Sequence, residues 1–338
     1  MKKLKIAQVG LGRLGYQHAK NIANHIPNAE LISICCTNID KLIKVQDELS
    51  IQNIYTDYYK MIDDGGFDAV IIVSPTNLHA EQIIYALNAG KHVFTEKPID
   101  LDITKSMEIL NILNKSQNLK LMLGFMRRFD LSYKIAKDKI DNGLIGDIIM
   151  IRSYTQDPIW NIKSAIKYGK YSGGQFYDMC IHDVDLIRWL TNGTKVKKLW
   201  AIGGCYEFNE YSSWGDGDNV SALIQLENDI MCFVFAGRAA AHGANIETEI
   251  VGTRGTLRIG RIGTDSLLES LNNHGVTRQC HNDFQSRWNK AYIEELKHFV
   301  EIVINDKEPD ITIKDGIESL KIVEKLKKSF ESEKMIKM

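Results

Sequence analysis

The sequence predicts an α/β protein with two domains, first a doubly wound parallel sheet and then an α+β domain with a large, mostly antiparallel open sheet. Two observations support this. Short apolar runs alternate with helical patterns up to about residue 125, and strand-like runs follow one another after it. The chain has 338 residues, 25% charged and 44% hydrophobic, which is typical of a soluble globular protein with room for two cores. We expect domains at 1–125 and 126–338.

The first domain is expected to be parallel because its apolar runs are continuous rather than alternating. Parallel strands are buried on both faces, and the helices that connect them cover those faces. Ligands of such a sheet bind at the carboxyl ends of its strands. The runs span 4–10, 29–36, 68–74, 91–98 and 119–125, and the helical patterns between them span 14–25, 38–48, 77–89 and 103–116.

The second domain changes from helical patterns to successive strands. The segments "LENDI" and "GTRGT" are typical of hairpin turns, so the strands that they join should run antiparallel. Two long amphipathic patterns close the chain. The expected strands span 147–155, 196–207, 219–228, 230–238, 247–253 and 255–260, and the expected helices span 131–143, 175–191, 284–305 and 313–331.

Composition argues against several classes of partner. The formal net charge is -1, so no basic excess predicts binding to nucleic acid or to an anionic membrane surface. No apolar run reaches membrane-spanning length, and the N-terminal run stops at Gly10, short of a signal-peptide core. The six cysteines include no C-x-x-C pair and mostly fall in apolar runs, which favours a reducing compartment. We therefore expect a cytoplasmic protein.

The turn after the first predicted strand reads "GLGRLG" and fits the pattern G-x-G-x-x-G. Gly10 permits the tight turn, Gly12 lets a pyrophosphate approach the backbone, and Gly15 lets the following helix pack on its strand. The unpaired N–H groups at the start of that helix would face the phosphates. We expect the whole turn, including Arg13 and Leu14, to bind a dinucleotide.

The end of the second predicted strand departs from the usual dinucleotide pattern. An Asp or Glu is expected there, about 20 residues after the glycines, to bond the adenosine ribose. This sequence has Cys36, Thr37 and Asn38 instead, with Lys41 one helical turn later. Thr37 and Asn38 can bond a ribose, and Lys41 can approach a phosphate. We favour NAD as the cofactor and leave NADP open.

Polar residues also follow the third predicted strand, where loops of an open α/β sheet meet the cofactor. Ser74, Pro75, Thr76, Asn77 and His79 are expected to line the nicotinamide ribose. Thr76 and Asn77 are equally suited to cap the next helix, and both roles can hold together.

Lys97 lies in "EKP", between Glu96 and Pro98, at the carboxyl end of the fourth predicted strand. A lysine at this edge can approach both the nicotinamide and a substrate hydroxyl, and Glu96 is expected beside the cofactor. Pro98 would fix the local backbone, and a bond before proline is the kind that can be cis. Taken alone, Lys97 would more readily be interpreted as a surface lysine beside a turn.

Motifs spread over nearly the whole chain point to one family. The motifs, in order, are "GLGRLG", "SPTNLH" at 74–79, "EKP" at 96–98 and "GGQFYDMCIHDVD" at 173–185. As a set they resemble the glucose-fructose oxidoreductase / inositol dehydrogenase / MocA family of NAD(P)-dependent sugar and polyol dehydrogenases. Three shorter segments are most similar to its inositol 2-dehydrogenase branch: "GFMRRFD" at 124–130, "DP" at 157–158 and "HG" at 242–243.

The resemblance implies a Rossmann domain for the cofactor and a second domain for substrate binding and oligomerisation, in a homotetramer. It implies oxidation of an inositol ring hydroxyl with NAD, for example myo-inositol to 2-keto-myo-inositol. Many relatives carry Asp at the position of Cys36, so the cofactor stays open. Some carry Arg at the position of Gln156, so the inositol isomer stays open. Two alternatives stand beside it: a dehydrogenase of another cyclic polyol or a sugar, and a dinucleotide-binding sensor without turnover.

The segment "YDMCIHDVD" at 177–185 should be helical, and it has three possible interpretations. Acids near a helix start favour its dipole and can simply be solvated, which suits Asp183 best. Asp178, His182 and Asp185 share one helix face and could ligate a metal, but a cation would sit poorly near Lys97. We favour the third interpretation, acid–base catalysis, and expect no metal.

Acid–base catalysis fits the oxidation of a secondary alcohol, in which the cofactor takes a hydride and a base takes a proton. His182 is the expected base, because its unperturbed pKa of about 6.5 suits work near neutrality. Asp178, one turn earlier, would hold the imidazole or bond the substrate, and Lys97 would stabilise the developing alkoxide. The resemblance carries the same roles onto these three residues, which we expect to converge on one hydroxyl.

A polyol substrate needs many hydrogen bonds and few charges. Arg127 and Asp157 can bond its hydroxyls, and Met126 and Trp160 can cover apolar ring edges. Arg127 could equally be structural. His242, in a loop after a predicted strand, is a weaker candidate, because a lone loop histidine is more often structural or solvated.

Overall fold

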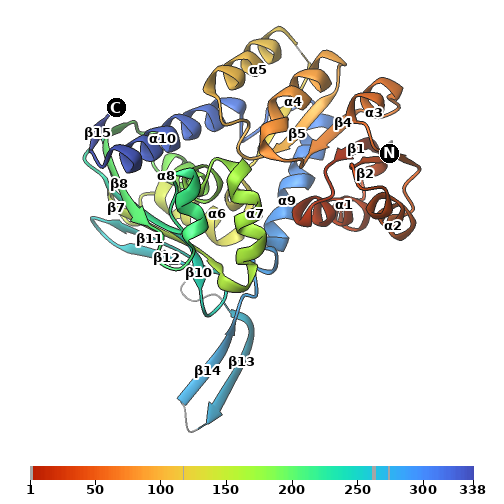
Figure 1. The fold of residues 1–338 in the computed structure, drawn as a ribbon. Helices are drawn as coiled ribbons and strands as arrows, with labels where there is room; N and C mark the ends of the chain where they lie inside the picture. Colours follow the sequence, from red (N-terminus) through yellow and green to blue (C-terminus); the bar gives the residue numbers. More distant parts are fainter. Residues whose placement is uncertain (1–2, 117, 261–263, 273–274) are drawn as a thin grey trace. The chain divides into compact units, whose positions relative to one another are not determined.

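The computed structural model describes residues 3–116, 118–260, 264–272 and 275–338. Its contacts divide the chain into two compact units. Unit 1 comprises Met1–Phe129 with Lys290–Glu318, and unit 2 comprises Asp130–Asn289 with Ser319–Met338. Each unit contains one large sheet with helices packed on it (Figure 1).

The division differs from the expected boundary in the last two helices. The sequence placed α9 (Phe284–Ile304) and α10 (Ile313–Ser332) wholly in the second domain, but each contributes a segment to both units. Aromatic packing explains the α9 segment, because the ring of Tyr292 lies edge-on to the ring of His18, with centroids 5.4 Å apart. The chain thus returns to complete the core of the N-terminal unit.

The sheet of unit 1 is parallel throughout, in the order β3-β2-β1-β4-β5-β6. The strand order reverses beside β1, so the loops after β1, β4 and β5 are neighbours at one edge, as a doubly wound sheet requires. This confirms the predicted fold class. The strands are β1 (Leu4–Val9), β2 (Ala29–Cys35), β3 (Asn53–Tyr55), β4 (Ala69–Ile72), β5 (His92–Glu96) and β6 (Leu121–Gly124).

In the described part of the chain, side chains cap three of the five helices of unit 1, but not the helices that begin at Arg13 and His79. Asn38, Asp57 and Asp102 each accept a main-chain N–H of the helix that follows, with Asp102 Oδ1 2.7 Å from the nitrogen of Thr104. The first helix has no such cap. The helices are α1 (Arg13–His25), α2 (Ile39–Leu49), α3 (Tyr58–Asp64), α4 (His79–Asn88) and α5 (Ile103–Lys115), and the sequence analysis missed α3 and β3.

The main sheet of unit 2 has the order β12-β11-β7-β10-β9-β8-β15. β7 and β10 are parallel, and the other neighbouring strands are antiparallel, which confirms the mostly antiparallel sheet. "LENDI" and "GTRGT" form the predicted turns. The strands are β7 (Ile148–Pro158), β8 (Val196–Gly204), β9 (Asn219–Leu226), β10 (Met231–Ala240), β11 (Asn245–Gly252), β12 (Thr256–Ile259) and β15 (Ile336–Lys337); β13 (Thr264–Asn272) and β14 (Gly275–Cys280) pair separately.

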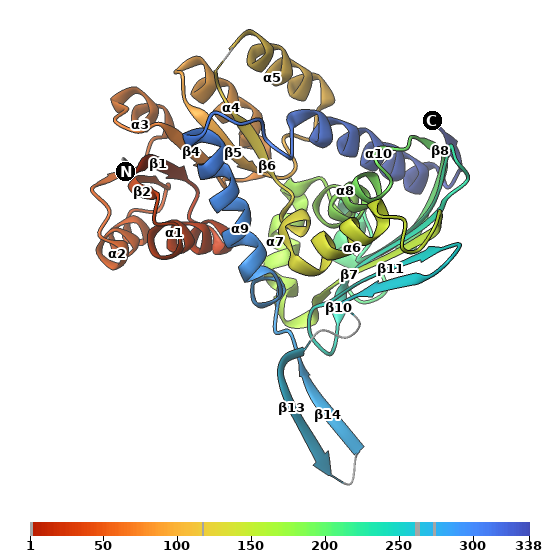
Figure 2. The same cartoon turned by 180° about the vertical axis from the view of Figure 1, so that it is seen from behind.

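The helices of unit 2 lie on one face of this sheet (Figure 2). They are α6 (Leu131–Asp141), α7 (Ile162–Ser172), α8 (Ile181–Leu190) and the C-terminal part of α10. The opposite face leaves large apolar side chains exposed, among them Trp200 on β8 and Leu223 on β9, which are direct cross-strand partners. Within the described residues, no helix is both long enough and apolar enough to cross a membrane.

Candidate active site

The glycine-rich turn between β1 and α1 has the geometry that its sequence predicts. Gly10 has φ +93°, and a Cβ added to it would lie 2.3 Å from the carbonyl oxygen of Val73. A Cβ on Gly15 would lie 2.2 Å from the carbonyl oxygen of Gly10. An added Cβ on Gly12, by contrast, meets nothing within 4 Å. Gly10 and Gly15 are therefore needed for packing, whereas Gly12 leaves open space beside the helix start.

The residues present fit a dinucleotide pyrophosphate. α1 begins directly after Gly12 with no side-chain cap and no acidic residue in its first turn. The first N–H groups of a helix attract anions, so this end is suited to phosphate. Arg13 is exposed and Leu14 half-buried beside it.

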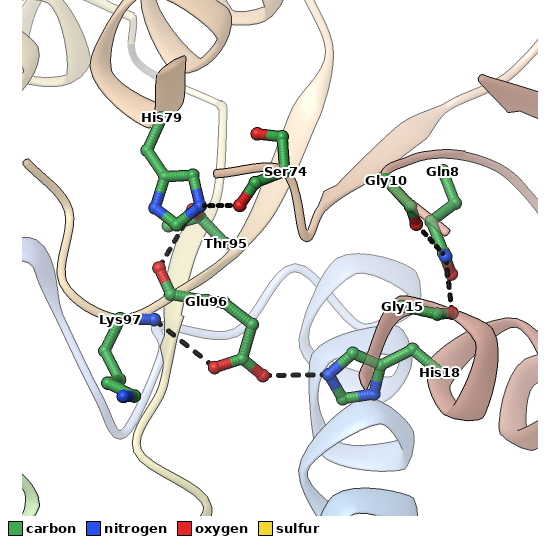
Figure 3. A network of polar contacts seen from close by, with 9 residues as sticks. All are labelled: Gln8, Gly10, Gly15, His18, Ser74, His79, Thr95, Glu96 and Lys97. Atoms are coloured by element: carbon green, nitrogen blue, oxygen red, sulfur yellow. Dashed lines mark hydrogen bonds and ion pairs between the residues drawn. The ribbon is translucent and has the colours of Figure 1, made fainter. Parts of the chain in front are cut away.

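Gln8 holds this turn together, and the sequence analysis missed it. Its side chain is fully buried in β1, and its Nε2 donates to the carbonyl oxygens of Gly10 at 3.0 Å and Gly15 at 2.7 Å (Figure 3). The signal was a lone amide inside the apolar run 4–10, where a buried polar group must find partners.

The stretch after β2 presents no carboxylate to a ribose. Cys36 is half-buried, and Thr37 and Asn38 are exposed. Asn38 Oδ1 accepts the main-chain N–H of Lys41 at 2.9 Å, so this predicted ribose ligand also caps α2.

The loop after β4 is organised by His79. This side chain is buried, with Nε2 2.8 Å from the carbonyl oxygen of Ser74 and Nδ1 2.8 Å from that of Pro98. Burial lowers the pKa of His79. The hydrogen bonds to the two carbonyl groups favour the protonated form and raise the pKa, but burial outweighs them. His79 thus ties the loop to the turn after β5, and both of its ring nitrogens are used inside the protein.

The other predicted residues of this loop differ in exposure. Ser74 Oγ donates to Gln82 Oε1 at 2.5 Å, and Thr76 is buried. Pro75 and Asn77 are exposed at the surface of the loop. The N-cap residue of α4 is Leu78, whose side chain makes no cap hydrogen bond.

Glu96 and Lys97 stand at the end of β5, next to the loop just described. Glu96 Oε1 lies 2.8 Å from His18 Nε2, and its Oε2 accepts the main-chain N–H of Lys97 at 3.3 Å (Figure 3). The bond between Lys97 and Pro98 is cis. Lys97 is half-buried, and its side chain extends away from the Glu96 carboxylate. Unit 1 therefore gathers the glycine turn, the loop after β4 and Lys97 at one sheet edge.

In unit 2, Asp178 and His182 come from one continuous helical segment. Asp178 lies in a π-helical turn, Phe176–Cys180, that runs directly into α8. π-helical turns are rare and occur frequently at functional sites. Asp178 is half-buried, and His182 is 8% exposed.

Arg238 is a second residue, after Gln8, that the sequence did not predict for the site. Its Nη1 lies 2.6 Å from Asp157 Oδ2, and its Nη2 donates to Asp178. Burial by itself lowers the pKa of Arg238, but the carboxylates of Asp178 and Asp157 outweigh burial and raise that pKa above its ordinary value. A fully charged guanidinium therefore fixes both predicted carboxylates. Nothing local in the run "VFAGR" marks it, because its partners lie 60 and 81 positions away.

The expectation for Asp183 was wrong. Asp183 is 0% exposed, and its carboxylate accepts hydrogen bonds from Ser153 Oγ at 2.6 Å and Thr155 Oγ1 at 2.9 Å. These hydroxyls are on β7, so Asp183 fastens α8 to the sheet. Asp185 is also buried. The helix pattern alone could not predict the burial of Asp183, because its hydrogen-bond donors come from the sheet under the helix.

The remaining substrate candidates are divided between the units. Met126 and Arg127 lie buried in a short helix, Met126–Phe129, of unit 1. In unit 2, Trp160 is 51% exposed and donates through Nε1 to the carbonyl oxygen of Asn282 at 3.1 Å. His242 is exposed in the turn after β10.

Comparisons with known proteins agree along the whole chain. Residues 4–125 match the oxidoreductase family with an NAD-binding Rossmann fold, and residues 133–258 match the GFO/IDH/MocA C-terminal domain. The NAD(+)-dependent scyllo-inositol 2-dehydrogenase of Bacillus subtilis is 35% identical over 95% of this chain and 92% of its own. The myo-inositol 2-dehydrogenase of Thermotoga maritima is 30% identical over 99% and 98%.

Solved structures give the same result. The scyllo-inositol dehydrogenase of Lactobacillus casei, solved with NAD(H) and scyllo-inositol, is 42% identical with a TM-score of 0.95 and covers 99% of both chains. The myo-inositol 2-dehydrogenase of Lactobacillus plantarum is 37% identical with a TM-score of 0.97 and covers 100% of both. The chain belongs to the GFO/IDH/MocA family of oxidoreductases, and its first domain is an NAD-binding Rossmann domain.

Proposed function

We propose that this protein is an NAD-dependent dehydrogenase that oxidises a ring hydroxyl of inositol to a ketone. The observation that carries the proposal is similarity over full length to inositol dehydrogenases, at 42% identity over 99% of both chains for the Lactobacillus casei enzyme. The two carboxylates that Arg238 holds, those of Asp157 and Asp178, support a site for a polyhydroxylated substrate. Carboxylates fixed in place can accept hydrogen bonds from several hydroxyls.

We assign the work on the reacting hydroxyl to three side chains and the cofactor. When bound, NAD supplies the hydride acceptor. His182 takes the hydroxyl proton, and Lys97 donates to the oxygen as negative charge develops on it. Asp178 stabilises the imidazolium that forms, or bonds the substrate directly. Arg238 holds the Asp178 carboxylate in place, so the charge that balances the imidazolium is preorganised.

The cofactor and the polyol have separate sets of proposed ligands. Arg127, Asp157 and His242 bond the hydroxyls of the polyol, while Met126 and Trp160 cover apolar edges of its ring. The ligands of NAD are Gly10, Gly12, Arg13, Leu14 and Gly15, then Cys36, Thr37 and Asn38, then Ser74, Pro75, Thr76, Asn77 and His79, and finally Glu96 and Lys97. His79 acts through the loop that it holds.

The isomer is the finer part of the proposal. Scyllo-inositol carries every hydroxyl equatorial, and myo-inositol differs by one axial hydroxyl at C2. Oxidation of that carbon gives the same ketone from either isomer. We propose that both serve as substrates, in line with the relatives of both names.

The test is a panel of purified protein with NAD or NADP and myo-, scyllo- or chiro-inositol, other polyols or aldoses, followed by the absorbance of reduced nicotinamide. Turnover of scyllo- or myo-inositol with NAD is the expected result. Turnover only of other polyols or sugars would replace the substrate. NAD binding without turnover of any polyol would indicate a sensor instead.

We also propose a cytoplasmic homotetramer. The exposed apolar face of the seven-stranded sheet, which includes Trp200 and Leu223, suits pairing with a second copy. All six cysteines are free thiols, which suits a reducing compartment. Light scattering of the purified protein gives the mass of the assembly directly.

A further inference from the structure

Three buried titratable side chains of unit 1 lie together at the end of β5. His18 comes from α1, Glu96 from β5 and Glu295 from α9, and one nitrogen or oxygen atom of each lies within 4.8 Å of the others. His18 and Glu295 are 0% exposed, and Glu96 is 5% exposed. The roles proposed above do not use Glu295 at all.

The hydrogen bonds within this cluster leave Glu295 unsatisfied as an anion. The one ring nitrogen of His18 that faces the cluster is already 2.8 Å from Glu96. Among the described residues, neither carboxyl oxygen of Glu295 has a hydrogen-bond donor. Buried ionised carboxylates require donors or a cation, so the charged form of Glu295 is disfavoured here. Burial, and then the charge of Glu96, raise the pKa of Glu295 well above its ordinary value.

A proton resolves this mismatch. A carboxylic acid is a donor as well as an acceptor, and a carboxylate oxygen of Glu96 lies within 4.8 Å of one of Glu295. We propose that Glu295 is a positioning residue that works as a neutral acid, donating its O–H to Glu96 and thereby fixing the turn that presents Lys97.

Glu96 connects this cluster to the proposed active site. With Glu295 as donor, the Glu96 carboxylate receives hydrogen bonds from His18, from the main chain of Lys97 and from α9. His18 lies on the helix whose start is suited to phosphate. The cluster therefore joins that helix to the strand end that bears Lys97. The inference rests on the proposed role of Lys97.

A metal ion is the competing occupant, and the geometry favours the proton. Two ligand atoms of a tetrahedral zinc ion lie about 3.4 Å apart, given bonds of about 2.0–2.1 Å. The His18 to Glu96 distance of 2.8 Å is that of a hydrogen bond. A metal-bound histidine also donates its other N–H to a partner, whereas His18 Nδ1 has none among the described residues.

The kinetic experiment compares Glu295→Gln with Glu295→Met in the full chain. The amide keeps a neutral donor, so Glu295→Gln should retain kcat and the pH profile. Methionine keeps only the bulk, so Glu295→Met should lose roughly 10- to 100-fold in kcat, the size of one hydrogen bond to a charged group. Glu294→Gln, an exposed neighbour on the same helix, is the matched control and should be unchanged. Equal loss in the Gln and Met variants, or full activity in the Met variant, would overturn the proposal.

An infrared measurement decides the protonation without any assay of activity. The difference spectrum of wild type against Glu295→Gln at neutral pH should contain the carbonyl stretch of a protonated carboxylic acid. Absence of that band, or stoichiometric metal in the purified protein, would overturn the inference. If no polyol is turned over but the band is present, the proposed function fails and the neutral acid stands.

Discussion

The turn after β1 and the helical segment around Asp178 handle negative charge by opposite means. In unit 1, the helix start of α1 offers main-chain N–H groups, with no side-chain cap and no acidic residue in its first turn. In unit 2, the carboxylates of Asp157 and Asp178 are held by one buried guanidinium, that of Arg238. The first arrangement is local and depends on the absence of side chains. The second depends on one long-range partner and fails if that partner is lost.

The largest expected effect concerns the acid–base pair. Lys97→Ala or His182→Ala should lower kcat by roughly 10²–10⁴-fold, the usual size of an acid–base contribution. If both act on one hydroxyl, the double variant should lose little more than either single variant, because groups that act as a unit are non-additive. Steady-state kinetics checks both statements, with the exposed Lys105→Ala as the control. Near-normal turnover in either single variant would remove the substituted residue from the mechanism. If the loss of kcat in the double variant equals the product of the two single losses, the two residues act independently.

Removing the guanidinium of Arg238 tests whether this side chain holds the carboxylates of Asp157 and Asp178. Arg238→Met should cost about 3–5 kcal/mol of unfolding free energy, because it leaves two half-buried carboxylates without their cation. Arg258→Met, which breaks the exposed pair with Glu249, should cost no more than about 1 kcal/mol. Urea unfolding of both variants gives the two values. If Arg238→Met is as mild as Arg258→Met, the charge is not holding the carboxylates.

Two glycine variants test whether the main chain of the turn after β1 binds the phosphates of NAD. Gly10→Ala should destabilise the protein by about 1–3 kcal/mol, because the backbone is left-handed there and the new methyl group meets Val73. Gly12→Ala should leave stability nearly unchanged but weaken NAD binding about tenfold, a loss of about 1.4 kcal/mol. Gly90→Ala shares the positive φ of Gly10 without any close contact, so it isolates the backbone contribution. Thermal unfolding and NAD titration separate the outcomes, and unchanged NAD affinity in Gly12→Ala would place the phosphates elsewhere.

Asp218 in unit 2 offers a further test, because main-chain N–H groups hold a carboxylate there. Its Oδ2 accepts from Glu207 and Phe208, each at 2.8 Å. Burial raises the pKa of Asp218, but these N–H groups outweigh burial and hold the pKa below its ordinary value. Asp218→Ala should cost about 1–3 kcal/mol at neutral pH.

The pH dependence of that cost has a definite sign. A lowered native pKa means that the carboxylate stabilises the fold above the ordinary Asp pKa of about 3.9, and that this stabilisation is lost as the pH falls through the native pKa. Urea unfolding should therefore show the gap between wild type and Asp218→Ala narrowing in acid. The exposed Asp229→Asn is the control. A gap that is independent of pH would mean that packing, not charge, accounts for the loss.

The sequence by itself determined the parallel sheet, the glycine turn and the position of Lys97 at a strand end. These follow from local patterns, since continuous apolar runs require burial on both faces and Gly10 is needed where the chain turns left-handed. It also predicted hairpins such as "LENDI", because two strands joined by a short turn must pair.

The tertiary structure alone decided which distant groups meet. Arg238 reaches Asp157 and Asp178 across 81 and 60 positions, and Asp183 is buried because β7 places two hydroxyls beneath it. Glu295 belongs to the unit of His18 only because α9 returns to it. Charge pairing and burial depend on distances between elements, and the sequence pattern within an element does not contain those distances.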